Sequence, residues 1–572
     1  MSTLDWYILA ITLVGIVLYG LYKSTATKNI DGYFRGNQSM PWYLVLLGIV
    51  GTQASAITFI SAPGQAFTDG MRFVQYYFGL PLAMIVICIF FVPKFQQLNV
   101  YTAYEYLEQR FNKNTRTFTA FLFLLGRGLS TGVSIYAPSL ILSSLFGWNI
   151  FVTNCIMGGI VIIYTVSGGA KAVAYTQQLQ LLIIFSGLAY CGYYLVSHLP
   201  ENYSFNHSLR IAGLHEKMNI ITTGVSNGTF QWKDKYNIVS GLVGGFFLAL
   251  SYFGTDQSQV GRYLSGKNIR ETKLGLLMNG VVKIPMQLGI LLLGILLLAY
   301  YQFAPQPIFY NTAAVSNVTD TAALKQLWRI EKSFGANQQL LAEETHHFVA
   351  TSDATPSNTE QARALIAEQQ TLRKQYKQIL TNAGVADTND TNYIFLHFIK
   401  TTLPSGLVGL LIAIIFLAAW GSIAAALNAL ASSTLVDFVV PFSSAPLSEK
   451  QEYVYAKWIT LAWGIFCVIV AQFSSALGSL IEAVNILGSL FYGVILGIFL
   501  VAFMAPKVTG KTVFTVALIS EFIVVLLFTL DYNGIIGLGF LWLNVVGALL
   551  VYILSLAYTL ITKSGKTLSL RS

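Results

Sequence analysis

Long apolar runs follow one another along almost the whole chain, separated by mostly short polar stretches. Each run approaches the roughly 20 residues that an α-helix needs to cross a hydrocarbon core of about 30 Å. Within lipid every backbone amide must find its partner inside the protein, so runs of this kind are helices. The pattern predicts an all-α polytopic membrane protein with about thirteen transmembrane helices. They lie near residues 6–22, 41–61, 73–92, 118–144, 148–167, 176–197, 238–257, 272–302, 405–437, 454–476, 481–504, 511–531 and 536–561.

Two polar stretches are long, residues 199–236 and 304–404. Within the second, residues 321–384 are rich in Ala, Leu, Gln, Glu and Lys, which predicts one or two soluble helices forming an exterior cap or spacer. The segment TNYIFLHFIK at 391–400 has the pattern of an amphipathic helix lying at the membrane interface.

The composition agrees with a membrane protein, because 55% of the residues are hydrophobic and only 10% are charged. A net charge of +9 would suit an anionic partner such as nucleic acid, but the basic residues concentrate in alternate short loops. By the positive-inside rule these loops face the cytoplasm. We therefore expect no nucleic-acid partner, and an integral plasma (inner) membrane protein with its N-terminus outside and its C-terminus cytoplasmic.

Little in the sequence points to enzymatic chemistry. The six histidines lie in loops or near the ends of spans, and the four cysteines lie inside apolar runs, so neither type predicts a metal centre within the bundle. Two Gly-Lys-Thr triplets lack the upstream glycine of a phosphate-binding loop. We predict a protein that is not an enzyme and has no organic cofactor; no obligate protein partner is evident.

Polar residues inside apolar spans mark candidate functional positions. The middle of the second span, residues 51–58, reads GTQASAIT. A helix interrupted here would free carbonyl groups for a hard cation, although the same small residues also suit close helix packing. In the ninth span, Ser422 and Asn428 are the polar members of a small-residue face, and a hydroxyl there would complete an all-oxygen site for Na⁺.

These features together resemble the sodium/solute symporter family, which includes sugar, sialic acid, monocarboxylate, iodide and proline carriers. The matching segments are 51–64, Tyr136-Ala137-Pro138, residues 167–173 (SGGAKAV), residues 254–257 (GTDQ), Arg262-Tyr263-Leu264 and 428–437. The resemblance implies a leucine-transporter-like core of two inverted five-helix repeats. The implied organisation is an extra N-terminal helix and cytoplasmic loop at 1–40, a first repeat at 41–197, an extracellular loop at 198–237, a second repeat at 238–504 with an extracellular insertion at 304–404, and two C-terminal helices with a short cytoplasmic tail at 505–572.

The resemblance also implies a sodium site. Its ligands match the carbonyls of Gly51 and Ala54 in the broken helix, with a carbonyl and two hydroxyl positions at Ala418, Gly421 and Ser422. Gly421 departs from the family, which has Ser or Thr there. Two further departures are Gln177, where many members have Asp, and the alanines at 424 and 425, where members with a second sodium site have hydroxyls. We therefore expect one coupling ion per solute, and Na⁺ rather than H⁺.

Candidate solute contacts come from several spans. Arg127 could hold a carboxylate or pair structurally, and Lys283 matches a sugar-contacting position in relatives or extends toward the interface. Asp256 is predicted to pair with Arg262 rather than to contact solute. The full candidate set is Gln53, Ser55, Thr58, Gln75, Tyr76, Arg127, Lys283, Glu482 and Asn485.

The favoured interpretation is a secondary transporter that imports a small polar organic solute, such as a sugar or carboxylate, by symport with Na⁺. Gly421 and Gln177 keep open an uncoupled or H⁺-coupled carrier on the same fold. A non-transporting membrane sensor of solute is the remaining alternative.

Overall fold

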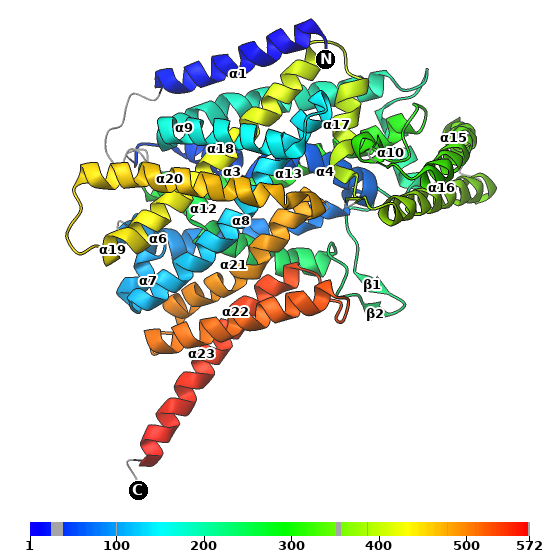
Figure 1. Cartoon of the computed structure of the whole chain (residues 1–572). Helices are drawn as coiled ribbons and strands as arrows, with labels where there is room; N and C mark the ends of the chain where they lie inside the picture. Colours follow the sequence, from blue (N-terminus) through cyan, green and yellow to red (C-terminus); the bar gives the residue numbers. More distant parts are fainter. Residues whose placement is uncertain are drawn as a thin grey trace.

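The computed structural model describes residues 1–23, 38–98, 100–316, 318–350, 356–385, 387–477 and 479–569, and most of these residues are helical (Figure 1). Strands in the described part are limited to the antiparallel hairpin of β1 (Val225–Ser226) and β2 (Thr229–Phe230).

The longer helices are α1 (Thr3–Lys23), α3 (Trp42–Gln53), α4 (Ala56–Asp69), α8 (Lys113–Phe146), α9 (Ile150–Ser197), α10 (Phe205–Leu214), α11 (Gly245–Thr255), α13 (Ile269–Tyr301), α15 (Thr321–Ala350), α16 (Pro356–Asn382), α17 (Thr391–Thr401), α18 (Leu407–Thr434), α20 (Glu449–Gln472), α21 (Leu480–Met504), α22 (Gly510–Tyr532) and α23 (Leu541–Ser569). Short helices are η2 (Met71–Tyr77), α5 (Leu80–Val86), η3 (Ile87–Phe91), α6 (Val92–Gln97), α7 (Glu105–Arg110), η4 (Ser240–Gly244), α12 (Gln257–Tyr263), α14 (Thr312–Ser316), η5 (Leu435–Val439), α19 (Val440–Phe442) and η6 (Ser474–Leu477).

The helices confirm a polytopic membrane protein. Among the described residues, nine helices are long and apolar enough to span a membrane, or ten when the bent pair α3–α4 counts as one span. The three remaining predicted spans correspond to shorter apolar stretches, Thr3–Ile16, Ile150–Val166 and Ser240–Thr255. A total of thirteen spans and the inverted repeat stay predictions.

The predicted spans 148–167 and 176–197 both fall within α9. Near its start, Asn154 Nδ2 donates to the Ala471 carbonyl at the end of α20 (3.3 Å). Near its end, Tyr194 Oη donates to the Thr402 carbonyl just before α18 begins (2.9 Å). The end of α20 and the start of α18 lie on one face, because these two spans are consecutive and joined by a short connection. Both ends of α9 therefore reach the same face, as two antiparallel spans would.

Helix α18 forms the centre of the bundle and packs against α1, α8, α9, α3 and α20. Its stretch from Ala418 to Ala431 is buried throughout and consists mostly of Ala, Gly and Ser. Small side chains let neighbouring helices approach closely, which accounts for this position. Functional groups on α18 consequently face other helices and not lipid.

The long insertion gathers at one end of the bundle, where α15 and α16 pack together beside α10 (Figure 1). The prediction that 391–400 lies at the membrane interface is wrong, because α17 packs against α4 and buries most of its side chains inside the protein. The side chain of Asn392 fixes this contact: its Oδ1 accepts from Ser61 Oγ on α4 (2.8 Å) and from the Leu480 amide at the start of α21 (3.3 Å). Helix α17 thus joins the insertion to two helices of the core.

Candidate functional site

The chain between α3 and α4 breaks the helix, and the two segments are bent by 64°. In a continuous helix the Gly51 carbonyl would accept from the Ser55 amide, but that amide donates to the Gln53 carbonyl instead (2.9 Å). The Thr58 amide likewise donates to the Ser55 carbonyl (3.0 Å) rather than to Ala54. Gly51 and Ala54, the two predicted carbonyl ligands, therefore both lack their usual helical donors within the described chain.

Helix α18 faces this break. The Ser422 hydroxyl lies in the cavity described below and donates to the Ala419 carbonyl (3.1 Å), which leaves its oxygen lone pairs available to a cation. Ala418 lies within the regular part of α18. Its carbonyl, unlike those of Gly51 and Ala54, therefore has its usual helical hydrogen-bond donor. Among the described residues, no group of three or more His, Cys, Asp or Glu side chains is arranged so that it could hold a metal ion. A cation here would be held by neutral oxygens, which suits a hard ion such as Na⁺.

Gln177 on α9 lies between these two elements. A Cβ atom placed on Gly51 would be 2.8 Å from Gln177 Cδ, and one placed on Gly421 would be 3.4 Å from Gln177 Nε2. The Gln177 side chain is almost fully buried, and neither of its amide atoms has a hydrogen-bond partner in the described structure. The two departures from the family pattern, at 177 and 421, therefore lie next to each other, with the glutamine amide beside the missing hydroxyl.

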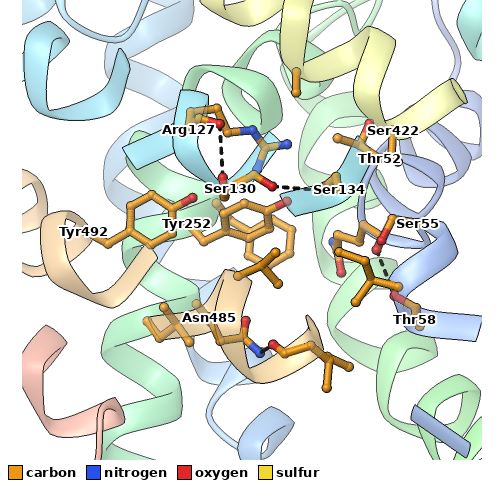
Figure 2. A pocket seen from close by; sticks show the side chains of 18 of the residues that line it. Thr52, Ser55, Thr58, Arg127, Ser130, Ser134, Tyr252, Ser422, Asn485 and Tyr492 are labelled. Atoms are coloured by element: carbon orange, nitrogen blue, oxygen red, sulfur yellow. Dashed lines mark hydrogen bonds between the residues drawn. The ribbon is translucent and has the colours of Figure 1, made fainter. Parts of the chain in front are cut away.

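A cavity of about 160 Å³ lies beside the helix break, between α3, α4, α8, α11, α13, α18 and α21 (Figure 2). This volume is close to that of a cavity of ~150 Å³ known to admit benzene. Without expansion, the cavity in this conformation holds a solute of about six non-hydrogen atoms. Its polar lining residues are Thr52, Gln53, Ser55, Thr58, Tyr76, Tyr77, Arg127, Ser130, Thr131, Ser134, Tyr252, Lys283, Ser422, Asn485 and Tyr492.

Basic side chains outnumber acidic ones around the cavity. Lys283 is 2% exposed and has no carboxylate within 4 Å among the described residues; its ammonium lies 5.4 Å from the centre of the Tyr77 ring. Arg127 Nη1 lies 3.8 Å from Asp256 Oδ2. Two basic side chains therefore face the cavity, with one carboxylate near them.

The predicted pair of Asp256 and Arg262 is wrong. Asp256 Oδ1 accepts from the amide and the hydroxyl of Ser258 (2.7 and 2.6 Å) and so caps α12, and its Oδ2 accepts from Tyr492 Oη (2.7 Å). These bonds direct the carboxylate toward Arg127 in the core. Arg262, although only six positions away in sequence, is thus not the partner of Asp256, and the packing of α8 supplies Arg127 instead.

The predicted solute residues divide into two groups. Seven of the nine line the cavity: Gln53, Ser55, Thr58, Tyr76, Arg127, Lys283 and Asn485. Gln75 and Glu482 do not. The Gln75 amide donates to Thr222 Oγ1 and to the Tyr236 carbonyl (both 3.0 Å), which holds the loop between α10 and η4. The Glu482 carboxylate accepts from Lys235 and from Tyr236 Oη (both 2.8 Å), so it is also occupied by that loop.

Several residues that line the cavity are not among the predicted solute contacts. Ser130, Thr131 and Ser134 share one face of α8 with the predicted Arg127 at helical spacing, and Figure 2 shows Arg127, Ser130 and Ser134 together. That spacing was a readable signal, because such positions share one side of a helix. Tyr252 and Tyr492 gave no comparable signal, since both lie in apolar runs with many other aromatic residues.

Comparison with known proteins agrees with this geometry. The sequence model of the sodium:solute symporter family matches residues 33–325 and 372–520. The sodium/sialic acid symporter SiaT of Proteus mirabilis (strain HI4320) is 25% identical over 98% of this chain and 95% of its own. The sodium/iodide cotransporter of Homo sapiens is 25% identical over 88% of this chain and 67% of its own, and the sodium-coupled monocarboxylate transporter 2 of Mus musculus is 24% identical over 87% and 67%.

A solved structure of a Na⁺-coupled sialic acid symporter, in a substrate-bound outward-open state, superposes with a TM-score of 0.74. The superposition covers 98% of each chain at 22% identity. At that identity the likeness establishes a common fold.

Proposed function

Because this chain belongs to the sodium:solute symporter family, we propose that it imports a small carboxylate-bearing solute together with one Na⁺ by alternating access. The observation that carries the proposal is the juxtaposition of the freed Gly51 and Ala54 carbonyls and the Ser422 hydroxyl with a cavity of excess positive charge. Three relatives are named for anions, namely sialic acid, iodide and monocarboxylates, which agrees with the charge of the cavity.

In the proposed cycle, Na⁺ binds between the broken helix and α18 and draws these two elements together. The adjacent hydroxyl and amide groups are thereby ordered for the solute, whose carboxylate is neutralised by Lys283 and Arg127. A cycle that moves one Na⁺ with one monocarboxylate carries no net charge across the membrane, so the Na⁺ concentration gradient supplies its drive. With a neutral solute, the membrane potential would add about 2.3 kcal/mol per 100 mV for the one positive charge moved inward.

A thermal-shift screen of the purified protein tests both the coupling and the charge of the solute. We expect short monocarboxylates to raise the unfolding temperature in NaCl but not in choline chloride, since a ligand that binds the folded state stabilises it by mass action. The matched control for each acid is its uncharged amide, which we expect to have no effect. Sialic acid, sugars and amino acids complete the panel.

A sugar or amide that stabilises as well as the acids would contradict the assignment of the solute. Stabilisation that is equal in both salts would contradict the sodium coupling and favour the second candidate, an uncoupled carrier. The position of the unpartnered Gln177 amide beside Gly421 is the observation that supports this second candidate.

Ser422→Ala should weaken sodium and solute together. The variant removes one oxygen ligand from the proposed site, and we expect the half-saturating Na⁺ concentration to rise about tenfold, corresponding to ~1.4 kcal/mol. The half-saturating solute concentration at fixed Na⁺ should rise with it. The measurement is sodium-dependent uptake of the solute by proteoliposomes.

The control variant is Ser139→Ala on α8, which likewise removes a buried hydroxyl that donates to the backbone (Ile135 carbonyl, 2.9 Å) but lies away from the cavity. If Ser422→Ala leaves the sodium dependence of uptake unchanged, Ser422 is not a ligand of the coupling ion.

A further inference from the structure

A second, smaller cavity lies between α12 and α18, and we refer to it as the lower cavity. Its volume is about 30 Å³. Polar and charged groups from two directions reach it: Gln257, Ser258 and Arg262 come from α12, and Asn428 and Ser432 come from α18. The proposed transport mechanism uses none of these side chains.

Arg262 carries a charge that nothing in the described structure neutralises. The residue is 9% exposed, and its guanidinium has neither a described carboxylate within 4 Å nor a described hydrogen-bond acceptor. Nearby carboxylates are occupied elsewhere: Asp256 is held by Tyr492 and Ser258. A largely buried charge without a counter-charge is costly, and the described part of the chain supplies none for Arg262.

Asn428 is the second unsatisfied group. It is 6% exposed, and neither Nδ2 nor Oδ1 has a hydrogen-bond partner in the part of the chain that the structure describes. Leaving a buried amide unpaired costs about 1–3 kcal/mol. The Asn428 amide and the Arg262 guanidinium thus offer N–H donors to one small space, and the charge that this space lacks is negative.

The position of the lower cavity relates it to the solute cavity. Ser422, Ile423 and Ala426 of α18 line the solute cavity, whereas Ala425, Asn428 and Ala429 line the lower one. Six residues separate Ser422 from Asn428, a rise of about 9 Å along a helix. The lower cavity lies in the direction of Asp437 and Arg116, at the end of α18 where the basic loops predict the cytoplasm.

We propose that the lower cavity binds one small monovalent anion through Arg262 and the Asn428 amide. A water molecule would fill the volume but leave the charge of Arg262 uncompensated, whereas a halide or a carboxylate group would do both. The anion comes either from solution, as chloride, or from the carboxylate end of the transported solute as it leaves the central cavity toward the cytoplasm. Only this second source rests on the proposed transport function.

Chloride titration of the purified protein tests the site without any transport. At constant Na⁺ and ionic strength, chloride is exchanged for gluconate, whose six-carbon chain exceeds the volume of the lower cavity. We expect chloride to raise the unfolding temperature of the wild type in a saturable way, and to have no such effect on Arg262→Gln. In gluconate, Arg262→Gln should be at least as stable as the wild type, because the variant removes an uncompensated charge.

Arg270→Gln is the matched control, since Arg270 is an exposed arginine in the first turn of the next helix, α13. It should keep the full response to chloride. Asn428→Ala provides a second variant and should shift the half-saturating chloride concentration upward by about tenfold. An equal, saturable response in the wild type, Arg262→Gln and Asn428→Ala, or no response in the wild type together with unchanged solute exchange in Arg262→Gln, would overturn the proposal.

Solute exchange across proteoliposomes distinguishes the two sources. If the anion is the solute's carboxylate, Arg262→Gln should slow exchange of a carboxylate solute at least tenfold while the thermal shift that this solute produces stays as in the wild type. If the anion is chloride, exchange in Arg262→Gln should be unchanged and only the chloride response lost. Failure to find any transported solute would count against the proposed function and leave the chloride titration as the test of the site.

Discussion

An Asp256→Ala variant should lose both thermal stability and solute uptake. The substitution removes the one carboxylate near Arg127, together with the cap of α12 and the acceptor of Tyr492 Oη. Breaking a buried pair by removing one partner costs on the order of 3–5 kcal/mol, because the remaining charge is left uncompensated. The separation of 3.8 Å between Arg127 and Asp256 places this pair toward the lower end of that range.

A double-mutant cycle separates the charge from the other contacts of Asp256. The cap and the tyrosine bond are lost equally in Asp256→Ala and in the double variant Asp256→Ala/Arg127→Met. The double variant should nevertheless unfold at a higher temperature than Asp256→Ala alone, since it carries no unpaired guanidinium. Equal unfolding temperatures for the two would show that Arg127 and Asp256 are not energetically coupled. Uptake should be lost in both, because Arg127 lines the solute cavity.

Gly51→Ala should abolish most sodium-dependent uptake, although it adds only one methyl group. The new Cβ would lie 2.8 Å from Cδ and 3.0 Å from Cβ of Gln177, so α3 and α9 would have to move apart at the helix break. Overpacking of this kind costs about 1–3 kcal/mol. When that cost falls on the conformation that binds the ion, the apparent affinity for Na⁺ drops about ten- to a hundredfold. Uptake measured against Na⁺ concentration checks this.

The control for this variant is Gly289→Ala in α13, where an added Cβ would meet no atom within 4 Å. There the substitution should be neutral or stabilise the helix by up to about 1 kcal/mol. The companion variant Gly51→Ala/Gln177→Ala removes the obstructing side chain and should recover part of the sodium dependence. Unimpaired uptake by Gly51→Ala itself would show that close packing at residue 51 is not required for coupling.

The membrane class and the location of the helix break could be predicted from the sequence, because both depend on local physics. Lipid imposes the length and composition of each span, and the run of small polar residues at 51–58 has few uses inside a bilayer other than an interruption or a close contact. The positions of Gln53, Ser55 and Thr58 in the cavity followed from that local pattern.

The predictions that the structure contradicts concern residues whose partners lie in segments far apart in the chain. Gln75 and Glu482 have polar side chains of the kind that bind solutes, but the loop between α10 and η4, more than a hundred residues away from each, takes up their hydrogen bonds. Asp256 was assigned to a neighbour in sequence, yet packing of α8 brought Arg127 to it. The helical spacing of Ser130, Thr131 and Ser134 behind Arg127 is, in contrast, visible in the sequence as a polar face on an otherwise apolar helix.

The contacts of Asn392 connect the long insertion to two of the helices that line the solute cavity. Helix α17 follows the insertion in the chain, and Asn392 joins it to α4, the second half of the broken helix, and to the start of α21. A movement of α4 relative to α21 must therefore break these two hydrogen bonds or displace α17. A protein that binds the α15–α16 pair and restrains α17 is for this reason expected to slow transport without occupying the solute cavity.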